Sequence, residues 1–257
     1  MIQVEQLSKS YTKKLNRGFG FKKPERFNAI SQVTFDALDG AITGLLGGNG
    51  AGKSTTLRII STLINPDSGR VSVDGFDTAT QPLEVRKNIG FLPHNAGIYP
   101  RLTAVENIRY YAEICGMSSE SINKRVSELV ERLGMSEFSE RRTEGFSQGQ
   151  RTKVALARAL VHKPRTIILD EPTNGLDVMA IRSLREIIRD LKNEGHCILL
   201  SSHVMQEVAA LCEHVVIIDA GKVVVSDSIK GIKNRTGCDD MEDAFVSVIE
   251  QSLEPSS

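Results

Sequence analysis

A glycine-rich stretch followed by lysine and serine is the strongest chemical signal in the sequence. Glycines let a backbone curl until successive N–H groups point at one anion, and a helix that follows adds its positive dipole end. The pattern G-x-x-x-x-G-K-[ST] predicts such a phosphate cradle. We expect Lys53 to contact the β- and γ-phosphates of ATP and to take part in catalysis, and Mg²⁺ to bind the Ser54 hydroxyl. The residues predicted to bind ATP here are Gly47, Gly48, Asn49, Gly50, Ala51, Gly52, Lys53, Ser54 and Thr55.

Two adjacent carboxylates, Asp170 and Glu171, follow an apolar run further along the chain. Their mutual repulsion and desolvation both cost stability, so folding alone does not require the pair. In P-loop ATPases a carboxylate at this place holds Mg²⁺, which predicts a metal-binding role for Asp170. Glu171 is predicted to be the catalytic base that polarises the attacking water. In isolation such a pair would be interpreted as a solvated strand end, but the upstream phosphate loop favours the catalytic interpretation.

The elements that must position these residues are short apolar runs that alternate with longer amphipathic stretches. This alternation is typical of a mostly parallel sheet flanked by helices, and unbroken apolar runs indicate strands covered on both faces. The runs are Ala41–Leu46, Ile89–Leu92, Thr166–Leu169, Cys197–Leu200 and Val215–Ile218. We predict one helix over Lys53–Leu63, directly after the glycine-rich loop, and another over Ile181–Leu191 that ends at Gly195.

The N-terminal third alternates apolar and polar residues instead, at positions 33–35 and 71–73. Asp39-Gly40 and Asp74-Gly75 supply hairpin-turn residues, so we expect an antiparallel β layer attached to the parallel core. A further hairpin turn is predicted at Ala220-Gly221.

Between residues 103 and 162 the apolar spacing becomes helical. Thr103 and Glu106 form a capping-box pattern, a second helix is expected over Ser121–Leu133 with Gly134 as its left-handed cap, and a third begins near Ser147. These residues predict an α-helical insertion within the α/β core.

Composition narrows the class of function. Lys+Arg and Asp+Glu both number 32, so the formal net charge is zero, and nucleic acid is not an expected partner. The cysteines Cys115, Cys197, Cys212 and Cys238 are scattered, as in a reduced cytosolic protein. No apolar run approaches the roughly 20 residues that span a bilayer, and the N-terminus lacks a signal-peptide core. The chain is not expected to cross a membrane by itself.

The segment Phe146-Ser147-Gln148-Gly149-Gln150 resembles the LSGGQ signature of ABC transporter nucleotide-binding domains. The resemblance covers nearly the whole chain. It implies that ATP lies between the phosphate loop of one copy and the signature residues of a second, where a helix start attracts the γ-phosphate. Phe146 and Gln148 depart from the family pattern, as they often do in export-type members. The residues assigned to ATP binding in trans are Ser147, Gly149, Gln150 and, from the similar D-loop segment Asn174–Asp177, Asp177.

Three further positions take roles from the resemblance. His203 follows a strand, as the family's switch histidine does, so a contact with the γ-phosphate and a catalytic role are expected. Tyr11 lies where the family stacks an aromatic ring on adenine, although a tyrosine near an N-terminal strand could equally serve packing. His94 replaces the usual Gln beside the metal. Because imidazole suits Mg²⁺ poorly, we expect His94 to act there through a hydrogen bond of its neutral ring, which would make turnover sensitive to mild acid.

The fold implied is of the α/β class: a P-loop NTPase core of the RecA type, an antiparallel β layer and an inserted helical subdomain. We assign residues 1–235 to the ATPase domain, with the core at 1–94 and 166–227 and the helical subdomain at about 95–165. Residues 228–257 are predicted to form a short C-terminal helical extension and a polar tail.

The function implied is an ATPase subunit, acting as an ATP-dependent homodimer, that drives export through an integral-membrane transporter subunit on a separate chain. It would sit in the cytoplasm against the inner face of the membrane, and the resemblance leans toward sodium efflux, with a drug-like cargo also open. The alternatives are an ABC-type ATPase acting on nucleic acid or ribosomes, and a regulatory module that holds ATP without turnover.

The segment Lys13–Arg26, with six basic residues and one acidic residue, is either a solvated loop or a contact with anionic lipid.

Overall fold

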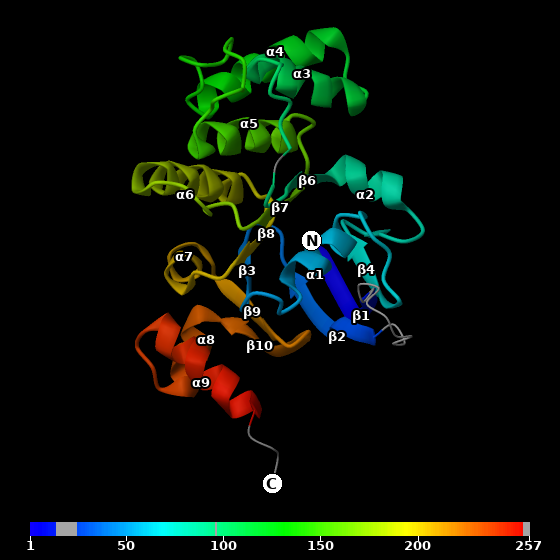
Figure 1. Cartoon of the computed structure of the whole chain (residues 1–257), viewed down its shortest axis with the longest axis vertical. Coiled ribbons are helices and arrows are strands. Elements are labelled where there is room, and N and C mark those ends of the chain that lie inside the picture. Colours follow the sequence, from blue (N-terminus) through cyan, green and yellow to red (C-terminus); the bar gives the residue numbers. More distant parts are fainter. Residues whose placement is uncertain (14–24, 96, 254–257) are drawn as a thin grey trace, which may run out of the picture.

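A six-stranded sheet forms the centre of the computed structural model, which describes residues 1–13, 25–95 and 97–253 (Figure 1). Its strands, in the spatial order β10-β9-β3-β8-β7-β6, are β10 (Lys222–Ser228), β9 (His214–Asp219), β3 (Ile42–Leu46), β8 (Cys197–Ser202), β7 (Thr166–Asp170) and β6 (Ile89–Leu92). Neighbours pair in parallel except β9 and β10, which are antiparallel across the turn at Ala220-Gly221. The predicted hairpin is therefore confirmed.

The central strands are covered on both faces, as their unbroken apolar character predicted. Every residue of β3, β7 and β8 is buried. Successive side chains point to opposite faces of a strand, so Ile167 and Leu169 join one apolar cluster while Ile168 joins the other. The cluster that contains Ile167 and Leu169 lies against the helices of residues 104–193, α3 to α6. The cluster that contains Ile168 lies toward the N-terminal sheet.

The N-terminal sheet has the strand order β2-β1-β4-β5, and all of its strand pairs are antiparallel. Its strands are β1 (Ile2–Lys13), β2 (Glu25–Ala37), β4 (Ser68–Val73) and β5 (Phe76–Asp77). Asp74-Gly75 joins β4 to β5 as the predicted hairpin. The hairpin predicted at Asp39-Gly40 is wrong, because β2 and β3 belong to different sheets. Both edges of β3 are taken by β8 and β9, so the turn at Asp39-Gly40 only redirects the chain.

Three helices lie together at one end of the molecule, coloured green in Figure 1. They are α3 (Ala104–Ile114), α4 (Ser119–Arg132) and α5 (Gln148–Leu160). The capping box of Thr103 with Glu106 is confirmed, and Ser147 forms a second one with Gln150. The predicted start of α4 is two residues late because Ser118 caps it. Gly134 has a φ of +59°, which confirms the left-handed cap.

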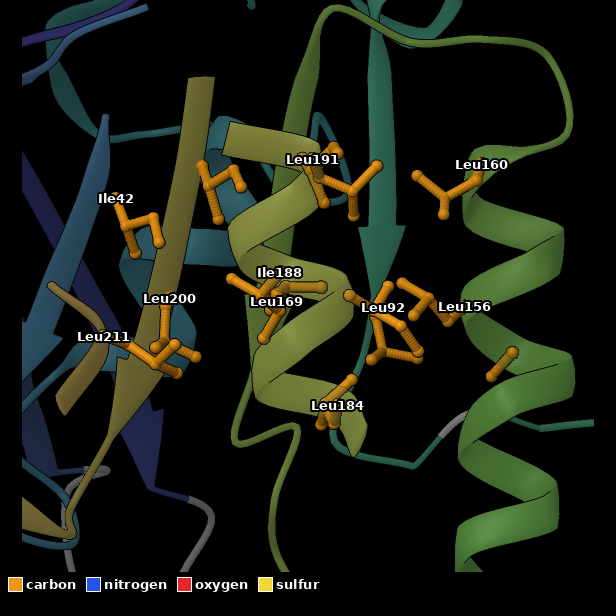
Figure 2. Close-up of a cluster of buried hydrophobic side chains, with 14 of the residues drawn as sticks. Ile42, Leu92, Leu156, Leu160, Leu169, Leu184, Ile188, Leu191, Leu200 and Leu211 are labelled. Atoms are coloured by element: carbon orange, nitrogen blue, oxygen red, sulfur yellow. The ribbon is translucent and has the colours of Figure 1, made fainter. Parts of the chain in front are cut away.

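The other helices connect or cover the central sheet. They are α1 (Lys53–Ile60), α2 (Pro82–Asn88), α6 (Val178–Asn193), α7 (Met205–Leu211), α8 (Ile229–Thr236) and α9 (Met241–Leu253). The end predicted for α1 at Leu63 is too late, since Thr62 turns left-handed with a φ of +59°. Leu184, Ile188 and Leu191 of α6 point toward the sheet (Figure 2). In the described part of the chain, no helix is long and apolar enough to span a membrane.

The boundaries assigned to the core, the helical subdomain and the C-terminal extension remain predictions. The basic segment between Lys13 and Arg26 falls on residues 14–24, which lie outside the described residues, as do residues 254–257 of the predicted tail.

Candidate active site

The glycine-rich loop lies between β3, the strand at the middle of the large sheet, and α1. A Cβ atom at Gly47 would lie 2.3 Å from the Ile218 carbonyl oxygen. Gly52 has a φ of +112°, and a Cβ there would lie 2.6 Å from a methyl of Ile30. Both positions therefore require glycine. The loop curls around the buried Lys53 ammonium, which donates to the carbonyls of Gly47 at 2.6 Å and Gly48 at 3.2 Å. This concave backbone with a positive charge in it fits a polyphosphate.

The predicted metal ligands meet at the carboxyl end of β7. Asp170 is buried, and the Ser54 hydroxyl lies 3.3 Å from its Oδ1 atom. Hydroxyl and carboxylate oxygens are hard ligands of the kind Mg²⁺ prefers. No group of three or more His, Cys, Asp or Glu residues suited to a metal ion exists in the described ranges. The oxygens of Ser54 and Asp170 fit Mg²⁺, which commonly takes its other ligands from phosphate and water.

Glu171 brings three parts of the site together. It has a left-handed backbone with a φ of +52° directly after β7. Its Oε1 atom lies 3.5 Å from Nζ of Lys53, and its Oε2 atom lies 2.6 Å from Nδ1 of His203. His203 follows β8, the parallel neighbour of β7, so both side chains emerge at one edge of the sheet. A carboxylate held between a cation and an imidazole at a phosphate site can accept a proton from water.

A cleft of about 650 Å³ extends from the loop to the N-terminal sheet. Tyr11 and Phe27 line it, and they pair directly across β1 and β2 with ring centroids 5.9 Å apart. Sequence reasoning found Tyr11 but missed Phe27. The one sequence signal for Phe27 was its position as an aromatic residue directly after the basic segment. Its pairing with Tyr11 could not be derived from sequence, because bulges between β1 and β2 shift the register of the two strands.

His94 is exposed and lines this cleft together with a second one of about 420 Å³. The second cleft lies between the loop after β6, the residues before α5, and the carboxylates Asp170 and Glu171. His94 is therefore placed at the junction of the two clefts. Its role at the metal remains a prediction.

The residues expected to act in trans lie elsewhere. Among the described residues that line the phosphate-loop cleft, none is Ser147, Gly149, Gln150 or Asp177. They group with one another instead: Asp177 caps α6 by accepting from Ala180 N–H at 2.8 Å, and a Cβ at Gly149 would lie 3.3 Å from that of Ala180. The site formed within one chain is thus made without them.

A phosphate loop after a central parallel strand, with a carboxylate pair at the end of another parallel strand of the same sheet, defines a P-loop ATPase. Within that class, residues 30–174 match the family model described as ABC transporter. The chain belongs to the ABC transporter family and is an ATP-binding ATPase of it. The predicted family, fold class and enzyme class are confirmed.

Named relatives agree with this assignment. The chain is 41% identical over 232 residues to the ABC transporter ATP-binding protein NatA of Bacillus subtilis, covering 90% of this chain and 94% of NatA. It is 32% identical over 253 residues to the linearmycin resistance ATP-binding protein LnrL of the same organism, covering 98% of this chain and 77% of LnrL. The dimeric ATP-binding cassette MJ0796, solved in a post-hydrolysis state with ADP and Pi, superposes with a TM-score of 0.76 at 26% identity over 89% of this chain and 99% of that one.

Proposed function

We propose that this chain is the ATP-hydrolysing subunit of an exporter whose membrane-spanning part is a separate polypeptide. The resemblance of the signature segment to export-type members supports this direction, and so does a relative named for linearmycin resistance. The cargo proposed is sodium or a drug-like compound. On this proposal the chain acts in the cytoplasm, against the inner face of the membrane.

The proposal that the chain hydrolyses ATP rests on the position of Glu171 between Lys53 and His203. The loop N–H groups and Lys53 bind the phosphates, and Glu171 accepts the proton of the attacking water. His203 holds the Glu171 carboxylate through one ring nitrogen and reaches the γ-phosphate with the other. Mg²⁺, held by Ser54 and Asp170, would neutralise charge on the transferred phosphate.

The active unit proposed is a two-fold symmetric pair. Ser147, Gly149, Gln150 and Asp177 lie together outside the cleft that holds the phosphate loop, so in this arrangement they complete the site of a second copy. A face that carries half of each site requires an isologous pair. The MJ0796 cassette, which is dimeric with ADP and Pi, supports this arrangement.

A co-purification experiment tests the transporter role. The tagged chain is expressed in its native host, membranes are solubilised, and the captured membrane protein is reconstituted with the chain in vesicles. We expect a polytopic membrane protein that stimulates phosphate release by the wild-type chain and not by Lys53→Ala. Capture of ribosomes or nucleic acid, with no membrane protein that stimulates turnover, would favour the non-transport alternative. A chain that binds ATP but never releases phosphate would contradict the ATPase role.

A further inference from the structure

One buried hydroxyl contacts both residues of the carboxylate pair. Ser201 lies in β8 directly beside Asp170 of β7 in the parallel ladder, and it is fully buried. Its Oγ–H donates to Asp170 Oδ1 at 2.7 Å. The same oxygen accepts the Glu171 backbone N–H at 3.0 Å. A serine hydroxyl has one donor and two acceptor positions, so it can make both bonds at once.

These bonds act where the backbone changes direction. Glu171 adopts the left-handed conformation, which residues other than glycine rarely occupy without support from their surroundings. Its N–H is held from β8 by both the Ser201 hydroxyl and the Ser201 carbonyl oxygen, the latter at 3.2 Å. The turn brings the Glu171 carboxylate to Lys53 and His203. Ser201 therefore supports the backbone geometry on which the position of the base depends.

The same hydroxyl restricts the rotation of the Asp170 carboxylate. Ser54 also donates to Oδ1 of Asp170, at the longer distance of 3.3 Å. Ser54 is the residue expected to bind the metal, so metal binding would be expected to alter its bond to Asp170. The bond from Ser201 comes from the sheet and does not involve a predicted ligand. This bond would thus keep Asp170 oriented both with and without the metal.

We propose that Ser201 is a positioning residue for ATP hydrolysis: its hydroxyl orients Asp170 toward Mg²⁺ and supports the Glu171 backbone. This inference rests on the proposed hydrolytic function, because it concerns the same carboxylates. Residues that orient metal ligands without touching the metal commonly change affinity or activity by about 10- to 100-fold when removed.

The test compares Ser201→Ala, which removes the hydroxyl, with Ser201→Thr, which keeps it. Phosphate release is measured against Mg²⁺ concentration at saturating ATP, and binding of trinitrophenyl-ATP is measured with Mg²⁺ and with EDTA. We expect Ser201→Ala to lower kcat by about 10- to 100-fold and to raise the Mg²⁺ concentration for half-maximal activity. Its binding of the probe in EDTA should match wild type, whereas the gain in binding on adding Mg²⁺ should shrink. Ser201→Thr should retain activity and Mg²⁺ dependence.

Thr166→Val is the matched control. Thr166 is buried at the opposite end of β7, and its hydroxyl donates to the Asp74 carboxylate at 3.0 Å. This variant loses a buried hydroxyl–carboxylate bond of the same kind, but away from the site. The Mg²⁺ dependence of its phosphate release should therefore match that of the wild type. Wild-type kcat and Mg²⁺ dependence in Ser201→Ala would overturn the inference, as would equal losses in the Ala and Thr variants. A wild-type chain without turnover would instead contradict the proposed function.

Discussion

Nδ1 of His203 and Oε2 of Glu171 lie 2.6 Å apart, although the two residues follow different strands of the sheet. Since β7 and β8 are parallel neighbours, the residues that follow them emerge side by side. Lys53, from the helix after a third strand, approaches the other oxygen of Glu171. Sequence segments far apart along the chain thus converge on one carboxylate.

Replacing Glu171 by Gln keeps the size of the side chain and removes its ability to take a proton. We expect turnover to fall by about 10²- to 10⁴-fold, while ATP binding persists and an ATP-bound dimer accumulates. Phosphate release and size-exclusion chromatography with ATP measure the two effects. Lys53→Ala should instead weaken nucleotide binding, because the loop loses its buried cation. Hydrolysis at the wild-type rate by Glu171→Gln would show that another group is the base.

Ser147→Arg tests the completion of each site by a second copy. The substitution should leave ATP binding to the monomer intact and prevent ATP-driven dimerisation of the Glu171→Gln protein. Ser118→Arg is the matched control, because Ser118 is likewise an exposed helix-capping serine whose hydroxyl accepts a backbone N–H. Each substitution should lower the free energy of unfolding by about 1 kcal/mol through loss of the helix cap. The two variants should therefore differ only in ATP-driven dimerisation. A Ser147→Arg protein that still dimerises with ATP would exclude the two-fold arrangement.

The paired rings of Tyr11 and Phe27 are expected to stack on the adenine. Stacking of a base on an aromatic side chain contributes about 1–3 kcal/mol, so Tyr11→Ala or Phe27→Ala should weaken ATP binding by about 5- to 150-fold. Inorganic tripolyphosphate, which has no base, should bind all variants alike. Tyr110→Ala removes an exposed ring on α3 and should leave both affinities unchanged. If Tyr11→Ala bound ATP as tightly as wild type, the ring would serve packing only.

His162 should make the fold less stable in mild acid. Burial lowers the pKa of its imidazole. The bond that Nε2 donates to the Ile89 carbonyl oxygen at 2.9 Å opposes this shift, and the charge of Arg125 adds to it, so the pKa stays below its usual value. The unfolded chain, where histidine titrates near pH ~6.5, therefore binds the proton more readily. The free energy of unfolding should fall as the pH drops below about 6.5.

His162→Gln removes this titration and keeps an N–H donor toward Ile89. Urea unfolding of both proteins at pH 7.5 and 5.5 is the measurement. The wild type should lose more stability than the variant between these two values, and the remaining histidines cancel in the comparison. An equal loss in both proteins would show that His162 does not bind its proton differently on folding.

The fold class was predictable because its signals are local. Unbroken apolar runs mark strands covered on both faces, and the Thr103–Glu106 pair marks a helix start through atoms only three residues apart. The turn at Asp39-Gly40 has hairpin residues, yet the sheet that receives the next strand depends on β8 and β9 much later in the chain. Turn chemistry alone could not predict that.

The candidate site likewise contains residues that local sequence motifs predict and residues that only the pairing of distant strands reveals. Residues with a motif of their own, such as Lys53 and Glu171, were found from sequence, and the structure brings them within 3.5 Å of each other. Phe27 and Ser201 were missed, because their importance arises only from the residues paired with them across strands. The roles of His94 and Ser147 remain predictions, since they concern a metal and a second copy.

The central position of β3 has a consequence for how the protein is made. Its partners, β8 and β9, are synthesised long after it: Ile42 pairs with Ile198, and Leu46 pairs with Ile217. Roughly 150 residues are added between the first pair, which takes on the order of ten seconds on a ribosome. For most of that interval the nascent chain contains the glycine-rich loop but lacks the strands that flank β3. An apolar strand with two free edges is therefore exposed to chaperones and to aggregation until the last third of the chain emerges.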